Sequence, residues 1–194
     1  MAIELTRRAA IGAAAGFAGC LVLGGASKAI AGENAPLRPP GAQDESHFLA
    51  TCIKCNRCVE ACPQHVLRTA TLEDGLLNWR TPVMNFRSGI CDFCGECQVA
   101  CPTLSIHDMS EKTSVIGVAV IDQDRCIAYQ GHGCRICVDT CPYGAISLGE
   151  NERPIVDSSL CNGCGRCEYK CPSNSYLTYA GGTDRGINIR GAKE

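Results

Sequence analysis

Apolar and polar positions divide the chain into three kinds of segment. The first is a long apolar stretch of mostly small and aliphatic residues, from Ala9 to Ala31. The second, Gly32–Ser46, is polar and proline-rich, and we expect it to form an extended linker or arm. From residue 47 onward, short apolar runs alternate with turn residues, which is typical of short β-strands. Strands are expected at Trp79–Met84, Val115–Ile121, Ala145–Leu148 and Ile155–Val156.

A cysteine run that ends in Cys-Pro occurs four times and uses sixteen of the seventeen cysteines. The runs begin at Cys52, Cys91, Cys126 and Cys161, in steps of 39, 35 and 35 residues, so one unit of about 35 residues repeats. Three runs follow C-x2-C-x2-C-x3-C-P, the ligand pattern of bacterial 4Fe–4S ferredoxins. In the third run seven residues separate the first two cysteines, and the rest of the pattern is intact.

The spacing also predicts which cysteines share a cofactor. Three thiolates of one run can surround one cluster, whereas the fourth cysteine of a run ligates the other cluster in two-cluster ferredoxins. Pairing neighbouring runs therefore predicts four 4Fe–4S clusters with crossed ligation. The first pair uses Cys52, Cys55 and Cys58 with Cys101, and Cys91, Cys94 and Cys97 with Cys62. The second pair uses Cys126, Cys134 and Cys137 with Cys171, and Cys161, Cys164 and Cys167 with Cys141.

Zinc sites and disulfides are the alternative uses of so many cysteines. Structural zinc needs two separated pairs or a Cys/His mixture, but three cysteines here are equally spaced and the four histidines stand at no ligand spacing. Cysteines two residues apart in one loop are poor disulfide partners. No nucleotide-binding or zinc-protease motif is present, so we expect no enzyme active site. The acids inside the cluster loops are expected to be solvated: Asp92, Glu96 and Glu168.

Composition favours a fold that is held together by its cofactors. Only 5% of the residues are aromatic, with a single tryptophan, so the hydrophobic core must be thin and the clusters must fill much of the interior. The net charge of −2 gives no sign of a nucleic-acid partner. We expect an α+β protein with two small tandem ferredoxin-like dicluster domains, at residues 47–108 and 114–180, followed by a flexible tail at 181–194.

Residues 1–31 read as an export signal. Arg7 and Arg8 in Thr-Arg-Arg-Ala-Ala-Ile resemble the twin-arginine motif, and Ala29-Ile30-Ala31 forms an A-x-A cleavage site. Because clusters are assembled in the reducing cytoplasm, a pathway that exports folded proteins suits such a cargo. The sequence therefore predicts a periplasmic protein that uses the twin-arginine export machinery. An uncleaved leader that anchors the chain in a membrane is the alternative, since the apolar stretch is about long enough to span a bilayer.

Segments outside the cysteine pattern resemble the NapF- and NapG-type accessory polyferredoxins of the periplasmic nitrate reductase system, over about residues 36 to 175. They are Leu37-Arg38-Pro39-Pro40-Gly41, Glu45-Ser46-His47-Phe48-Leu49, Cys126-Ile127-Ala128-Tyr129-Gln130 and Leu160-Cys161-Asn162-Gly163-Cys164-Gly165. The resemblance implies an electron-transfer protein whose partner is the nitrate reductase catalytic subunit or a membrane protein that oxidises quinol. It equally allows a cytoplasmic assembly factor, like NapF, that helps the catalytic subunit gain its own 4Fe–4S cluster.

Overall fold

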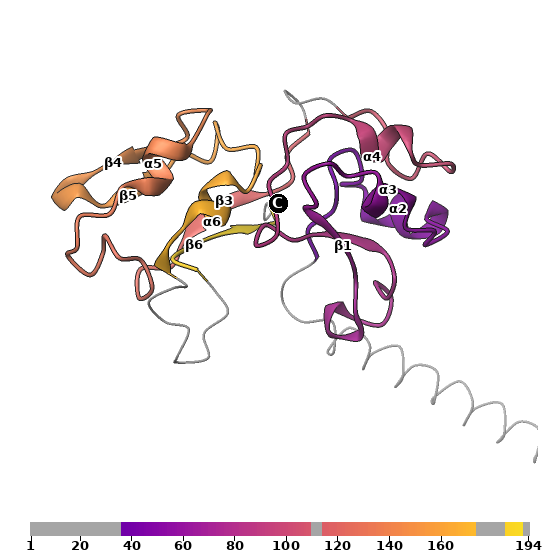
Figure 1. Cartoon of the computed structure of the whole chain (residues 1–194), viewed down its shortest axis with the longest axis horizontal. Coiled ribbons are helices and arrows are strands. Elements are labelled where there is room, and N and C mark those ends of the chain that lie inside the picture. The colour runs from indigo at the N-terminus through magenta and orange to yellow at the C-terminus, as the bar shows by residue number, and fades with distance from the viewer. Residues whose placement is uncertain (1–35, 110–113, 174–184, 192–194) are drawn as a thin grey trace, which may run out of the picture.

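A computed structural model describes residues 36–109, 114–173 and 185–191, and these residues form short helices and strands joined by long loops (Figure 1). The first half contains α2 (Glu45–Thr51), α3 (Arg57–Glu60), β1 (Leu67–Thr69), the 3-10 helix η1 (Leu72–Asp74), β2 (Pro82–Met84) and α4 (Glu96–Val99). The second half contains β3 (Val118–Ile121), α5 (Ile136–Thr140), β4 (Ile146–Leu148), η2 (Glu150–Glu152), β5 (Pro154–Val156), α6 (Arg166–Lys170) and β6 (Ile187–Arg190). The predicted leader lies outside the described residues.

The two halves repeat one pattern, in which an antiparallel strand pair follows the first cysteine run of each half. In the first half, which we call module 1, Leu67 pairs with Met84 across β1 and β2. In the second half, module 2, Ile146 pairs with Val156 across β4 and β5. The predicted strand at Trp79–Met84 is wrong in its first half, because Trp79 lies in a turn and β2 begins only at Pro82.

A third strand pair joins β3 to β6. Ala119 lies opposite Ile189 in this antiparallel ladder, and Ile187 and Ile189 are buried. The prediction of a flexible tail is therefore wrong for Ile187–Arg190, while residues 181–184 and 192–194 are not described. The sequence did not predict this strand, because the strand is only four residues long and its partner lies about 70 residues earlier in the chain. No local pattern can therefore indicate the pairing.

The proline-rich segment before the first cysteine run is packed, not extended into solvent. Pro39 and Pro40 are fully buried and Arg38 is nearly so. The helix α2 begins inside the predicted linker, at Glu45, and its N-cap Asp44 accepts a hydrogen bond from the amide of His47 at 3.0 Å. The expectation of an extended linker is thus wrong for residues 36–46, which belong to module 1.

One thin hydrophobic core runs through both modules, and cysteines form part of it. Phe48 and Ile106 are its largest fully buried apolar side chains in module 1, and Phe86 continues it toward module 2. There the ring of Phe86 covers Gly165, where an added Cβ would overlap the ring. Gly165 also has a φ of +78°, so both space and backbone conformation favour glycine. The helices in the described part of the chain lack the length and the apolar character that a membrane-spanning helix requires.

Candidate iron–sulfur sites

The structure gathers the sixteen described cysteines around four hollows. Site I is formed by Cys52, Cys55, Cys58 and Cys101, and site II by Cys91, Cys94, Cys97 and Cys62. Site III is formed by Cys126, Cys134, Cys137 and Cys171, and site IV by Cys161, Cys164, Cys167 and Cys141. Each site takes three cysteines from one run and the fourth from the neighbouring run, as the repeats predict. That these thiols ligate the clusters stays a prediction.

The regular loops curl because the residues on both sides of the second cysteine have left-handed backbone conformation. Around Cys55 these residues are Lys54, with φ 57°, and Asn56, with φ 62°. The same two positions have positive φ in the second and fourth runs, where they are Phe93 and Gly95, and Gly163 and Gly165. Alternation of this kind turns successive amide groups toward one side of the loop and forms a concavity that suits an anion. A 4Fe–4S cluster with four thiolates is such an anion.

The fourth cysteine of a run leaves the loop through a short helix. Cys141 and Cys171 are the C-caps of α5 and α6, with extended backbone (φ −71°, ψ 113° and φ −63°, ψ 122°). The following prolines disfavour helical conformation at these cysteines, so each helix ends there. The turn away from the helix is what carries each thiol to the site of the other run.

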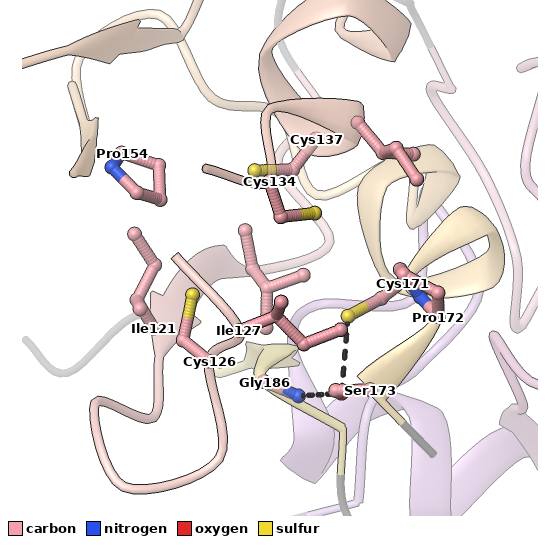
Figure 2. A pocket seen from close by; sticks show the side chains of 12 residues that line it. Ile121, Cys126, Ile127, Cys134, Cys137, Pro154, Cys171, Pro172, Ser173 and Gly186 are labelled. Carbon is pink, nitrogen blue, oxygen red and sulfur yellow. Dashed lines mark hydrogen bonds between the residues drawn. The ribbon is translucent and has the colours of Figure 1, made fainter. Parts of the chain in front are cut away.

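Site III shows the arrangement in detail (Figure 2). In this view Cys134 and Cys137 lie above the hollow, Cys126 lies at its left and Cys171 at its right, with Ile127 between Cys126 and Cys171. The rest of the lining is largely apolar and includes residues of three strands: Ile121, Pro154 and Ile187. Apolar walls lower the local polarity around any cofactor held here and strengthen its electrostatic interaction with the thiols.

A hydroxyl group approaches the fourth thiol of site III. The Oγ of Ser173 lies 3.2 Å from Cys171 Sγ and accepts a hydrogen bond from the amide of Gly186 at 2.6 Å (Figure 2). Because that amide occupies an acceptor position of the hydroxyl, the hydroxyl proton is free to point at the sulfur. In site I, the hydroxyl of Thr103 lies 3.7 Å from Cys101 Sγ at the same position in the repeat.

The four hollows have similar sizes, about 340, 330, 320 and 270 Å³ for sites III, II, I and IV, including space open to solvent. Similar volume and an identical set of four thiols indicate the same kind of occupant in all four. Among the described residues, no group of three or more Cys, His, Asp or Glu side chains could hold a single metal ion. None of the sixteen described cysteines forms a disulfide.

Burial makes the thiols hard to ionise when no cation is present. Desolvation, followed by repulsion from neighbouring thiolates, raises the pKa of Cys58 to about 12 and that of Cys137 to about 11. Burial also raises the pKa of Cys167, in site IV. Four thiolates therefore stay together only if positive charge between them offsets their repulsion, and iron supplies that charge. The residues at all four sites fit 4Fe–4S clusters.

The pKa of Cys101 is shifted in the opposite direction from the pKa values of these thiols. Burial works to raise its pKa, but hydrogen bonds from the amides of Ile106 and Thr103 and from the Thr103 hydroxyl outweigh burial and lower the pKa below its usual value. Hydrogen bonds to a thiolate stabilise negative charge, and they also stabilise the reduced state of a bound cluster. Sequence reasoning missed both Thr103 and Ser173. The signal that could have found them is the hydroxyl residue two positions after the fourth cysteine.

The two modules meet at their cluster loops. The amide of Cys91, in site II, donates a hydrogen bond to the carbonyl oxygen of Cys164, in site IV, at 2.9 Å. The contact of Phe86 with Gly165 lies beside it. Sites II and IV are therefore neighbours across the two modules, although site III lies between them in chain order. Figure 1 shows the same side of module 2, with α6 between α5 and module 1.

The acids in the cluster loops differ in their surroundings. Asp92 caps its own loop, because its carboxylate accepts hydrogen bonds from the amide of Cys94 and from Gln64. Glu168 was expected to be solvated, and this is wrong: it is buried and accepts a hydrogen bond from the amide of Ile189 at 2.7 Å. The carboxylate thereby fastens β6 to α6. The sequence could not indicate this burial, because Ile189 belongs to the strand that the sequence did not predict.

Comparison with known proteins gives the family. Residues 51–105 and 125–175 match the 4Fe–4S dicluster domain, so each half of the chain holds two clusters and the chain holds four. The methylamine utilization ferredoxin-type protein MauM of Methylophilus methylotrophus is 39% identical over 171 residues, which cover 81% of this chain and 75% of MauM.

Two ferredoxin-type proteins of Escherichia coli (strain K12) are similar over a shorter part of the chain. NapG is 38% identical over 152 residues, covering 70% of this chain and 65% of NapG. NapF is 35% identical over 140 residues, covering 70% of this chain and 80% of NapF. The resemblance to NapF- and NapG-type polyferredoxins is therefore confirmed, and MauM is a relative that the sequence analysis did not name.

Proposed function

This chain belongs to the ferredoxin-type 4Fe–4S dicluster proteins, and we propose that it is an electron carrier of the periplasm that serves a nitrate reductase system. Bound 4Fe–4S clusters accept and donate single electrons, at potentials that the protein sets through hydrogen bonds, burial and charge. We assign the sixteen cysteines of sites I to IV as the ligands. The chain has no substrate site of its own in this proposal, so it works between a donor and an acceptor protein.

The contact between Cys91 and Cys164 is the observation that supports an electron-transfer role. It joins the two modules through the loops of sites II and IV, with a backbone hydrogen bond of 2.9 Å between two predicted ligands. The core continues across the same contact through Phe86. This packed connection holds sites II and IV next to each other, which a carrier needs if electrons pass from one module to the other.

Assembly of the nitrate reductase catalytic subunit is the second candidate. One observation favours it: Cys55 and Cys94 are exposed, unlike the other thiols of their sites. A solvent-accessible ligand makes a cluster easier to lose or to pass on. In this role the chain would stay in the cytoplasm and bind the catalytic subunit before export.

A second redox system can be tested alongside, because MauM carries methylamine utilization in its name and aligns with more of this chain than NapG or NapF does. Deleting the gene in its host and comparing growth on nitrate as electron acceptor with growth on methylamine separates the two systems. We expect the defect with nitrate. A defect with methylamine alone would assign the chain to the other system.

An artificial electron donor distinguishes transfer from assembly. In extracts of the deletion strain, nitrate reduction with physiological donors should be low. If a dye that reduces the catalytic subunit directly restores the rate, electron supply was the missing function. If the rate stays low with the dye, the catalytic subunit was not matured, and the assembly role holds. Unchanged nitrate reduction with both donors would remove the chain from this system and leave a four-cluster ferredoxin of another pathway.

A further inference from the structure

Four large apolar side chains are exposed together on one loop of module 1. Leu72, Leu76, Leu77 and Trp79 are 64%, 68%, 68% and 48% exposed. All four lie between β1 and β2, in the segment Thr71–Arg80, which we call the apolar loop. A group of this kind on a small protein marks a surface that binds a partner or a membrane.

Polar contacts on the inner side of the apolar loop hold it in place. The guanidinium of Arg68 donates two hydrogen bonds to the carboxylate of Asp74, at 2.7 and 2.6 Å. Asn78 donates to the carbonyl oxygen of Asp74 at 2.8 Å and accepts from buried Arg38 at 2.6 Å. The loop is therefore ordered with its apolar side chains outside, so binding costs little further conformational entropy.

Module 2 shows that the dicluster fold does not require such a loop. The connection between β4 and β5 spans only residues 149–153, whereas the connection between β1 and β2 spans residues 70–81. Its 3-10 helix, Glu150-Asn151-Glu152, is exposed and acidic. The apolar residues of module 1 are thus an addition to one copy of a repeated unit.

The path of the N-terminal segment indicates what covers the apolar loop. The described chain starts beside it, because the carbonyl oxygen of Leu37 accepts a hydrogen bond from the amide of Met84 and Arg38 binds Asn78. The apolar stretch of the sequence ends at Ala31, five residues before Pro36. Five extended residues span at most roughly 17 Å. With the uncleaved leader, the alternative named above, a membrane that holds this stretch therefore lies within reach of the apolar loop.

We propose that the apolar loop inserts its leucines and Trp79 into the boundary between head groups and acyl chains of a lipid bilayer. Leucine is favourable in the acyl region, and tryptophan, apolar with one polar N–H, prefers the interface. Pro82, two residues after the loop, lines the hollow of site I. Leu67 and Met84 of the same strand pair line the hollow of site II. The contact therefore places module 1, with sites I and II, next to the membrane. It does not depend on whether the chain carries electrons or assists assembly.

Trp79 is the only tryptophan of the chain, so its fluorescence reports on the apolar loop alone. The full-length holoprotein is mixed with phosphatidylcholine vesicles, with and without phosphatidylglycerol, made from ordinary or brominated lipid. Brominated acyl chains should quench Trp79 relative to ordinary lipid. In the variant Leu76→Ser/Leu77→Ser the vesicle concentration needed for half-maximal quenching should rise at least about tenfold. The matched control, Leu148→Ser/Ile155→Ser, changes exposed apolar residues of module 2 and should behave as the wild type.

Iron content near the wild-type value shows that each variant is folded, as expected for side chains this exposed. If the protein sediments with vesicles but brominated lipid leaves Trp79 unquenched, the leader alone binds lipid and the proposal is wrong. If vesicles have no effect on Trp79 at all, the apolar loop serves a protein partner and the proposal is equally wrong. If both double variants lose vesicle binding equally, exposed apolar side chains adhere to lipid nonspecifically, and the proposal is again wrong.

Discussion

The hydroxyl of Ser173 lies 3.2 Å from the thiol of Cys171, and its own acceptor position is taken by the amide of Gly186. A hydroxyl held in this way donates to the sulfur, and a hydrogen bond to a cluster ligand favours the reduced state, which carries more negative charge. Ser173, which belongs to no recognised motif, therefore influences the redox chemistry of site III.

Replacing Ser173 with alanine should therefore lower the reduction potential of the site III cluster. A loss of about 1 kcal/mol of stabilisation of the reduced state corresponds to roughly 40 mV for a one-electron couple. Redox titration followed by electron paramagnetic resonance measures it. Ser147→Ala, which changes an exposed hydroxyl on β4, is the matched control and should leave all potentials unchanged. A potential that rises or stays constant in Ser173→Ala would contradict the hydrogen bond.

Metal content is the most direct test of the four sites. Protein purified without oxygen should contain about 16 iron and about 16 labile sulfide per chain. Removing iron with a chelator should unfold the chain, because the apolar core is thin and the clusters fill much of the interior. Circular dichroism of the metal-free protein follows this loss. Zinc in the purified protein in place of iron would refute the assignment.

Two double variants test crossed ligation at sites III and IV. If Cys171 ligates the same cluster as Cys126, Cys126→Ser/Cys171→Ser removes one cluster and leaves about 12 iron. Cys161→Ser/Cys171→Ser should then remove two clusters and leave about 8. Ligation within single runs predicts the opposite order of the two values. Cys20→Ser, outside all four runs, is the control and should keep the full iron content.

Arg38 connects the N-terminal segment to the rest of module 1. It is 5% exposed and donates to Glu45, Asn78 and Thr81. Arg38→Met removes the hydrogen bonds of the guanidinium to these partners and should lower the free energy of unfolding by about 2 to 3 kcal/mol. Arg135→Met is the control, since Arg135 and Asp139 form an exposed ion pair worth at most about 0.5 kcal/mol.

Anaerobic urea titration of both holoproteins, followed by cluster absorbance and circular dichroism, compares the midpoints of unfolding. The midpoint of Arg38→Met should fall clearly below that of Arg135→Met. Equal midpoints would mean that the N-terminal segment is bound only loosely.

Export is tested at the leader. Changing Arg7 and Arg8 to lysine should leave the protein in the cytoplasm with its clusters intact, because the twin-arginine pathway reads both arginines. Cell fractionation and the N-terminal sequence of the periplasmic form measure this. The matched change of Arg185 and Arg190 to lysine keeps the same chemistry outside the leader and should not alter export. An unchanged distribution in the leader variant would favour a cytoplasmic protein.

The cysteine runs by themselves determined the cofactor class and the grouping of the thiols. Ligand spacing is local chemistry: a run of C-x2-C-x2-C must bend around a cluster, and the Cys-Pro that follows must end the short helix. The repeat of about 35 residues likewise predicts two similar modules, and the matches to the dicluster domain follow that division. Short apolar runs gave β4 and β5 nearly to the residue.

Only the tertiary structure determined how the two modules are joined and where the C-terminal strand β6 packs. The strand β6 pairs with β3, and the amide of Ile189 donates a hydrogen bond to buried Glu168, across a separation of 21 residues that leaves no pattern in the sequence. In the sequence, Arg38 is one charge in a proline-rich segment. Only the structure shows that it binds Thr81 and Asn78. The contact of Cys91 with Cys164 brings sites II and IV together, and it depends on backbone groups, which every residue except proline carries alike. Local spacing therefore specified each site, whereas packing between distant segments placed the sites relative to one another.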